Sequence, residues 1–173
     1  MLPAFPVELK PYNPNWANAA EHEAGRLHTA LGEVLVGVHH IGSTSIPGQL
    51  AKPILDLVPV VRSHVTLEAA QGRLEALGYV GRGEFGLAGR RYFVLDAVDR
   101  RLVQLRCYEE GNPAIARHLA FRDYLRLRAD LVADYEELKR RCAELHRESS
   151  QAYSLCKGDW IRRIEAEALA ALG

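Results

Sequence analysis

The chain has 173 residues, of which 48% are hydrophobic and 25% are charged, as in an ordinary globular protein, and we expect one domain over residues 1–173. Lysine plus arginine equals aspartate plus glutamate at 22 each, so the net charge gives no reason to expect bulk nucleic-acid binding or membrane-surface binding. No apolar run reaches the ~18 residues of a membrane span. The N-terminus lacks a basic region followed by an apolar core, and we therefore expect a cytoplasmic protein.

The sequence also predicts the state of the cysteines. The three, Cys107, Cys142 and Cys156, are odd in number and too far apart for a zinc knuckle. Because cysteines of cytoplasmic proteins are normally kept reduced, we expect three free thiols.

Helices and strands are predicted to alternate in the N-terminal half. Apolar residues recur every three or four positions after Asn13-Pro14 and stop at Gly32, which is typical of a helix. Two apolar runs indicate buried strands, and a turn of glycine, serine and threonine connects them. In chain order the expected elements are a helix over 13–32, a strand over 35–41, a turn over 42–48, a strand over 53–61 and a helix over 63–78. Ser63 is the expected N-cap of the last helix, and Ser43 or Thr44 could cap a short helical turn.

The C-terminal half begins with a hairpin and ends in helices. Four glycines between 81 and 89 indicate loops, with a short strand near Phe85. Strand-like runs over 91–96 and 101–108 are separated by a short polar stretch, as in a hairpin. Three helices are expected after them, one with Asn112 as N-cap, one with Asp130 as N-cap and one following Ser149. Strands followed by helices predict an α+β (mixed α/β) fold with a helical C-terminal third.

Residues suited to binding phosphate or a metal are concentrated in and just after the turn between the first two strands. Gly42, Ser43, Thr44 and Ser45 supply small side chains, hydroxyls and backbone N–H groups, which suit phosphate oxygens. Asp56 lies at the start of the next strand, where it could hold a metal or an acceptor hydroxyl beside that phosphate. A turn of this composition can equally be an ordinary loop, so composition alone leaves both interpretations open.

Motifs spread over nearly the whole chain resemble those of the GrpB family, within the nucleotidyltransferase superfamily of the polymerase-β type. They are YNPNW at 12–16, HIGSTSIPG at 40–48, AKPILD at 51–56, EGNP at 110–113, HLAFRDYL at 118–125 and YSLCK at 153–157. The resemblance implies a nucleotidyltransferase-like mixed sheet with flanking helices, and a predicted nucleotidyltransferase of unsettled substrate. In that superfamily a Gly-Ser turn holds the nucleotide phosphates, and an Asp-x-Asp pair binds magnesium.

Three positions depart from the pattern that the resemblance implies. Val58 stands where the superfamily has the second acid, two residues after Asp56 on the same strand face. Gln104 and Arg106 stand where many GrpB sequences have His-Leu-His, and they share one face of their strand. Mg²⁺ can bind through one carboxylate when substrate phosphates complete its shell, so Asp56 is the candidate Mg²⁺ ligand and catalytic residue. A two-metal mechanism needs more acids than these.

Basic side chains are the remaining candidates for ligand binding. Arg106 could neutralise a nucleotide without a metal, because a guanidinium binds phosphate bidentately and keeps its charge. Lys157 falls on the apolar face of the last predicted helix, where it would either reach the surface or meet an anion. Lys52, at the mouth of the second strand, has a similar claim. His39 and His40 point to opposite faces of their strand, and His40 is the candidate because it belongs to the 40–48 motif.

The sequence therefore predicts a protein that binds a nucleotide or another phosphorylated small molecule, with nucleotidyl transfer to an unknown acceptor as the associated reaction. The alternative is a module that kept the fold, lost the acids and acts by binding a ligand or a protein partner.

Overall fold

The computed structural model describes residues 5–173, and its central element is a five-stranded sheet of order β1-β2-β5-β4-β3. Strand β1 (Leu35–Ile41) pairs antiparallel with β2 (Leu55–Val61), and β2 pairs parallel with β5 (Arg101–Glu109). On its other side β5 pairs antiparallel with β4 (Arg91–Asp96), which pairs antiparallel with β3 (Val80–Gly81). The predicted mixed sheet and α+β class are confirmed.

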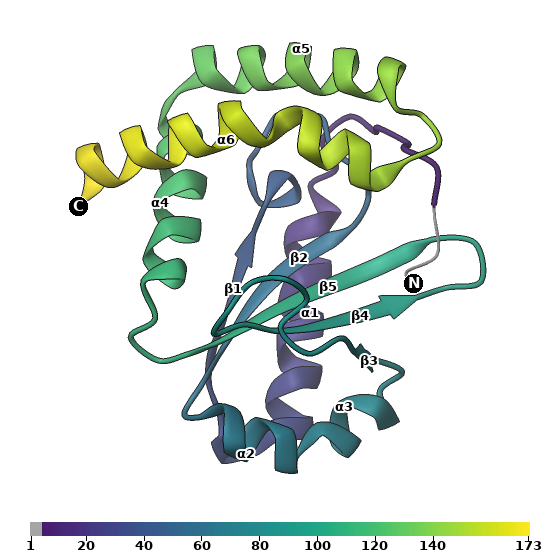
Figure 1. Cartoon of the computed structure of the whole chain (residues 1–173), viewed down its shortest axis with the longest axis vertical. Coiled ribbons are helices and arrows are strands. Elements are labelled where there is room, and N and C mark those ends of the chain that lie inside the picture. The colour runs from purple at the N-terminus through teal and green to yellow at the C-terminus, as the bar shows by residue number, and fades with distance from the viewer. Residues whose placement is uncertain (1–4) are drawn as a thin grey trace.

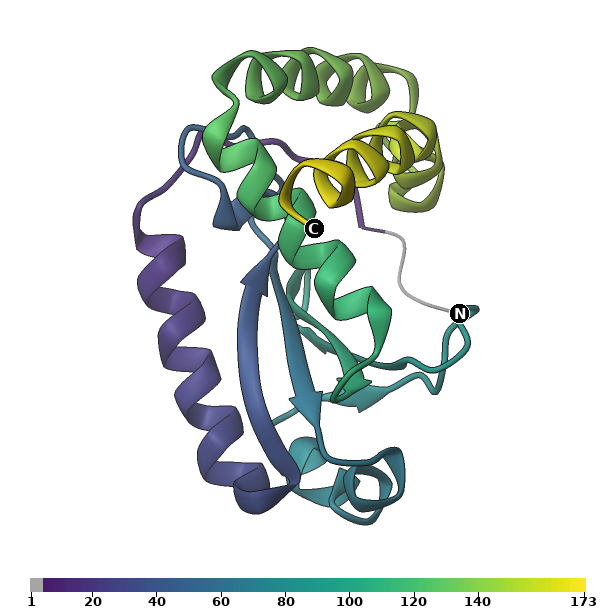
Figure 2. The same cartoon turned by 90° about the vertical axis from the view of Figure 1, so that its left-hand side faces the viewer.

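Within the described residues, six α-helices surround this sheet. In chain order they are α1 (Asn15–Leu31), α2 (His64–Ala69), α3 (Gln71–Ala76), α4 (Pro113–Leu127), α5 (Ala129–Leu145) and α6 (Ser150–Leu172). Helix α1 covers one face of the β1–β2 pair and α4 covers the other, as Figure 2 shows. Helices α5 and α6 lie together at one end of the sheet, and the short helices α2 and α3 lie at the opposite end (Figure 1). Within residues 5–173, no helix combines the length and the apolarity needed to cross a membrane.

Each face of the sheet has its own core because side chains alternate along a strand. Leu57 and Leu105 belong to the core on the α1 side. Val58 and Tyr108 lie on the opposite face, where they pack with residues of α4. A third apolar cluster, which includes Tyr135, joins α4, α5 and α6. The end of the α4 face nearest α5 and α6 is therefore bordered by two cores, and it carries the candidate site.

The N-caps predicted at Ser63 and Asn112 are confirmed, and the N-cap predicted at Asp130 is wrong. The side chains of Ser63, Asn112 and Ser149 each accept a hydrogen bond from a backbone N–H in the first turn of α2, α4 and α6. Asp130 was expected to cap α5, but this helix begins two residues earlier than that cap implies, with Arg128 at the N-cap position. Asp130 instead lies in the first turn and forms an ion pair with Arg128 at 2.7 Å.

Three element boundaries also differ from the predictions. The single helix expected over 63–78 is two helices that break at Ala70, and Gly72 lowers the helix propensity beside the break. The strand expected from residue 53 begins at Leu55. The strand expected near Phe85 is wrong, because β3 lies at 80–81 and the glycines that follow adopt turn conformations.

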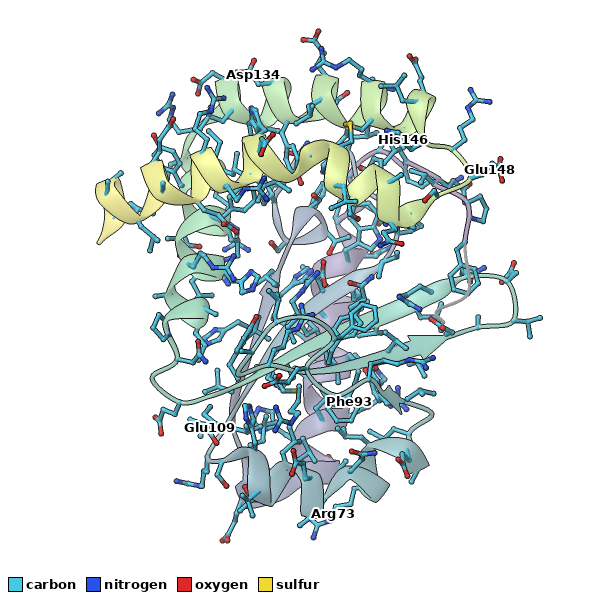
Figure 3. The ribbon with its side chains drawn as sticks, viewed as in Figure 1. Arg73, Phe93, Glu109, Asp134, His146 and Glu148 are labelled. Carbon is cyan, nitrogen blue, oxygen red and sulfur yellow. A yellow bond between two sulfur atoms is a disulfide. The ribbon has the colours of Figure 1, made fainter. Side chains whose placement is uncertain are left out.

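The expectation of three free thiols is wrong. Cys142 of α5 and Cys156 of α6 form a disulfide, which Figure 3 shows between the two helices. Their Cα atoms lie 5.9 Å apart because α6 turns back along α5. Among the described cysteines only Cys107 is free, and it is buried. Spacing along the chain cannot show this pairing, since it depends on how two helices dock.

Candidate functional site

A cavity of about 340 Å³ opens on the α4 face, between the sheet, the Gly-Ser turn and helices α4, α5 and α6. Six of its lining side chains are lysine or arginine and only two are carboxylates. A larger and more open hollow of about 540 Å³ lies over α1, and it contains none of the predicted site residues. The smaller cavity is therefore the candidate site.

The Gly-Ser turn forms one edge of this cavity. Gly42 has φ +71°, a conformation that favours glycine, and Ser43–Ser45 form a single 3₁₀ turn after it. Neither Ser43 nor Thr44 caps this turn, because Gly42 occupies the cap position and no side chain caps it. An ideal Cβ on Gly42 would lie 3.0 Å from Asp56 Oδ2, so the missing side chain lets the turn sit directly against this carboxylate.

Asp56 and Arg106 form an ion pair on the floor of the cavity. Asp56 lies opposite Gln104 in the parallel pairing of β2 and β5, so Arg106 stands two residues further along the same face. The Arg106 Nη1 group donates to Asp56 Oδ1, and its Nη2 group lies 3.4 Å from Gln104 Oε1. Burial lowers the pKa of Arg106, but the adjacent Asp56 carboxylate, together with Tyr92 and Tyr108, more than offsets this and holds the pKa above its ordinary value. The guanidinium therefore stays charged.

Three lysines meet above this floor, and we call Lys52, Lys139 and Lys157 the lysine cluster. Lys139 is 1% exposed and its Nζ donates to Ser43 Oγ and, at 2.6 Å, to the backbone oxygen of Leu50. Lys52 Nζ donates to a serine hydroxyl of α6 at 2.9 Å. None of the ion pairs found among the described residues involves a member of the lysine cluster.

Tyrosine rings support the lysine cluster. Lys139 Nζ lies 4.1 Å from the ring centroid of Tyr135, and Lys157 Nζ lies 4.2 Å from that of Tyr153. Contacts of this kind stabilise a partly desolvated cation by about 0.5–2 kcal/mol. Burial, followed by the charge of Lys52, still lowers the pKa of Lys157 to about 7. Burial, followed by the charge of Lys157, also lowers the pKa of Lys139 well below its ordinary value.

The wall formed by α4 adds His118 and Arg117. Burial is the largest cause that lowers the pKa of His118 to about 3, so its imidazole is neutral. Its Nε2 atom is buried and has no hydrogen-bond partner within residues 5–173. Arg117 donates to Glu165 of α6 at 3.0 Å, which pairs the second carboxylate of the cavity. Both carboxylates are thus matched by arginine, and the lysine cluster is left without a matching anion.

The structure brings most of the predicted site residues together. Those that line the cavity are Gly42, Ser43, Thr44, Lys52, Asp56, Gln104, Arg106 and Lys157. His40 and Ser45 do not line it. His40 Nε2 lies 2.8 Å from Thr44 Oγ1, and Ser45 donates to the Gly42 oxygen at 2.5 Å while its own backbone oxygen accepts from Arg126. Both residues therefore hold the shape of the turn.

Sequence reasoning missed Lys139, Tyr135 and Tyr153 as site residues. A signal for Lys139 was present, since it lies four residues after Tyr135 and three before Cys142, on the apolar face of α5. The same spacing argument selected Lys157 on α6. Arg90 was missed for a different reason, because it reaches the cavity from the glycine-rich loop before β4, where no periodicity exists.

The donor set at Asp56 does not fit the magnesium that the superfamily pattern implies. Within residues 5–173 no group of three or more His, Cys, Asp or Glu side chains could hold a metal ion. Val58, at the position of the second acid, is fully buried. Two unit charges of like sign 4 Å apart repel by about 4 kcal/mol at an effective dielectric constant of 20, and a divalent ion beside Arg106 would face about twice that. A magnesium ion therefore does not fit beside Asp56.

Comparison with known proteins agrees with this fold. Residues 6–167 match the family described as GrpB protein. UPF0157 protein YqkA of Bacillus subtilis (strain 168) is 41% identical over 168 residues, which cover 97% of this chain and 49% of that protein, so the chain spans about half of its length. The crystal structure of conserved protein GrpB from Enterococcus faecalis has a TM-score of 0.89 and 38% identity over 95% of this chain and 98% of that chain.

A weaker similarity is to the Cid1 poly(U) polymerase with MgGTP bound, at 17% identity and a TM-score of 0.46 over 77% of this chain and 41% of that chain. At this level nothing about the present chain is inferred from it. The family match covers nearly the whole chain, and the agreement in structure with a solved GrpB protein is equally extensive. The chain therefore belongs to the GrpB family.

Proposed function

We propose that the cavity binds the phosphate groups of a nucleotide or of another phosphorylated small molecule. The observation that carries this proposal is the lysine cluster. The chain has only four lysines against 18 arginines, and three of the four line this one cavity. Such a concentration of compact, titratable cations supports an anionic ligand.

Electrostatics supports the same ligand class. A buried charge left without its partner typically costs about 3–5 kcal/mol, which is why buried cations are normally matched by carboxylates. The two carboxylates of the cavity are already paired with Arg106 and Arg117. A ligand with two or more negative charges would supply the missing anion and form charge-assisted hydrogen bonds with the lysine cluster.

The Gly-Ser turn would add further hydrogen bonds to the phosphate groups. The Ser43 hydroxyl, which accepts from Lys139, would donate its own proton to a ligand oxygen. As a member of the GrpB family, the protein resembles polymerase-β-type nucleotidyltransferases in this turn and in the acid that follows it. Nucleotidyl transfer to an unidentified acceptor is therefore the reaction class that we propose, with Asp56 beside the acceptor hydroxyl.

A second candidate function is a binding module without catalysis. It is favoured by one observation, the ion pair between Asp56 and Arg106, which occupies the acid that catalysis would use. In this case the protein would sense or carry a phosphorylated ligand, or present the liganded cavity to a protein partner.

Ligand binding is tested by thermal unfolding of the purified chain with ATP, GTP, CTP, UTP and tripolyphosphate. A ligand at about 100 times its Kd stabilises the folded state by about 2.7 kcal/mol, which is readily visible as a rise in Tm. We expect a rise for Lys10→Met, which alters the lysine outside the cavity, and a much smaller rise for Lys157→Met. No rise with any of these compounds in the wild-type protein would refute the proposal.

Catalysis is tested separately, by release of pyrophosphate from each bound nucleoside triphosphate in the presence of cell-extract small molecules and RNA as acceptors. Release that is lost in Asp56→Asn supports nucleotidyl transfer. Tight binding without release supports the non-catalytic module.

We also propose a cytoplasmic location and a small-molecule partner rather than bulk nucleic acid. The balanced net charge supports a small-molecule partner rather than bulk nucleic acid. The Cys142–Cys156 disulfide counts against a cytoplasmic location, because disulfides are rare in reducing compartments. Counting free thiols in protein isolated under alkylating conditions from the native host would test it.

A further inference from the structure

We propose that the Arg106 guanidinium takes the place of a divalent cation at Asp56, so that ligand phosphates meet this guanidinium rather than a metal. The inference rests on the proposed function for its ligand. It also makes a statement about Asp56 and metals that can be tested with no ligand present.

The first support is the position of the Asp56 carboxylate. One of its oxygens, Oδ1, accepts from Arg106 Nη1. The other, Oδ2, lies so close to Gly42 that even a Cβ there would come within 3.0 Å of it. Mg²⁺ requires near-octahedral oxygen ligands and retains several waters, and a carboxylate enclosed on both sides in this way offers little room for that shell.

The second support is the chemistry of the neighbouring positions. Val58, which would carry the second acid, packs against the apolar side of α4 and is fully buried. Gln104 lies directly opposite Asp56 in the sheet and supplies a neutral amide. The only charged side chain that contacts Asp56 is therefore the cationic Arg106, within the part of the chain that the structure describes.

The third support is the set of Arg106 N–H donors that Asp56 and Gln104 do not use. A guanidinium has five N–H donors, and Asp56 and Gln104 use one each. The remaining donors belong to a side chain that lines the same cavity as the Gly-Ser turn and the lysine cluster. A planar guanidinium can bind two phosphate oxygens at once, and its contacts with Asp56 and Gln104 orient it within the cavity.

Mn²⁺ binding tests the metal statement directly, because the electron paramagnetic resonance signal of free Mn²⁺ falls on binding. We expect the binding curves of wild type and Asp56→Asn to coincide, since the guanidinium keeps the ion away from this carboxylate. Arg106→Gln removes the positive charge, and Arg106→Lys is the matched control that keeps it. Arg106→Gln should bind Mn²⁺ roughly ten-fold more tightly than Arg106→Lys. A wild-type Mn²⁺ site that disappears in Asp56→Asn, or equal binding by the two Arg106 variants, would overturn the inference.

Calorimetric titration with ATP and tripolyphosphate then tests the ligand statement. Wild-type affinity should be equal or lower in millimolar Mg²⁺ than in EDTA, since Mg²⁺ neutralises the phosphates that the guanidinium binds. Arg106→Gln should weaken binding in EDTA by roughly ten-fold or more. Wild-type binding that is about ten-fold tighter in Mg²⁺ refutes the inference. If neither compound binds in either buffer, the proposed function fails, and the Mn²⁺ experiment still decides whether Asp56 accepts a metal.

Discussion

Raising the pH should weaken ligand binding steeply, because Lys157 of the lysine cluster loses its proton in the physiological range. Burial, followed by the charge of Lys52, lowers the pKa of Lys157 to about 7 in the free protein. Burial, followed by the charge of Lys157, also lowers the pKa of Lys139. A bound polyphosphate favours the protonated amines, so it should raise both pKa values toward their ordinary range. Binding is then accompanied by proton uptake.

The magnitude follows from the pKa of Lys157. Each pKa unit corresponds to about 1.36 kcal/mol, so two pH units above a pKa of about 7 reduce the binding free energy by up to about 2.7 kcal/mol. Because Lys157 is already half deprotonated at pH 7, the affinity for tripolyphosphate should therefore fall by up to about 50-fold between pH 7 and pH 9. The free protein should show the opposite trend. Since the folded-state pKa of Lys157 lies below its unfolded value, the unfolded chain binds more protons in this range, and the free energy of unfolding rises with pH.

Calorimetry in two buffers of different ionisation enthalpy measures the proton uptake, which we expect to be about one proton per ligand near pH 8. Lys157→Met should flatten the pH dependence. Lys10→Met is the matched control, because Lys10 is the one lysine outside the cavity and its side chain is 52% exposed beside Glu8. An affinity that stays constant from pH 7 to pH 9, with the same binding enthalpy in both buffers, would show that the reasoning about the lysine cluster is wrong.

Two further predictions concern the scaffold of the site. Gly42→Ala should lower the free energy of unfolding by about 2–4 kcal/mol, because only glycine adopts this conformation readily and because the added Cβ would contact Asp56. Gly48→Ala should lower it less, since Gly48 also has positive φ but a Cβ there would have no neighbour within 4 Å. Equal urea midpoints for the two variants would contradict this. Reducing the Cys142 disulfide should lower the free energy of unfolding by roughly 2–3 kcal/mol, because the bridge closes a loop of sequence separation 14. Alkylation of the denatured, unreduced protein should modify Cys107 alone, and modification of all three cysteines would disprove the disulfide.

Local patterns in the sequence predicted much of the fold and part of the site. Apolar periodicity located α1, apolar and strand-like runs located β1 and the β4–β5 hairpin, and polar cap residues located the starts of α2 and α4. The last helix was expected after Ser149, where α6 begins. These features depend on residues a few positions apart, so a single sequence contains them. The break at Ala70 and the start of α5 were missed because neighbouring residues allow more than one boundary there.

The placement of His40 shows where local reasoning fails. Its membership of the 40–48 motif made it a candidate for the pocket, but strand alternation places it on the opposite face from Ile41, which lines the cavity. Which face of β1 meets α4 is decided by the pairing of β1 with β2 and by the cores on each side. No motif contains that information.

The sequence by itself determined that hydroxyls and backbone N–H groups of the kind that suit phosphate oxygens are concentrated at the Gly-Ser turn, and that Val58 replaces a second acid after Asp56. It also placed Arg106 among the candidate site residues. Only the tertiary structure decided that Arg106 pairs with Asp56 and that Lys52, Lys139 and Lys157 meet in one cavity. The reason is physical. Side-chain type and spacing act over one or two turns of backbone, whereas sheet register and helix docking follow from burying apolar faces of segments that lie up to about a hundred residues apart.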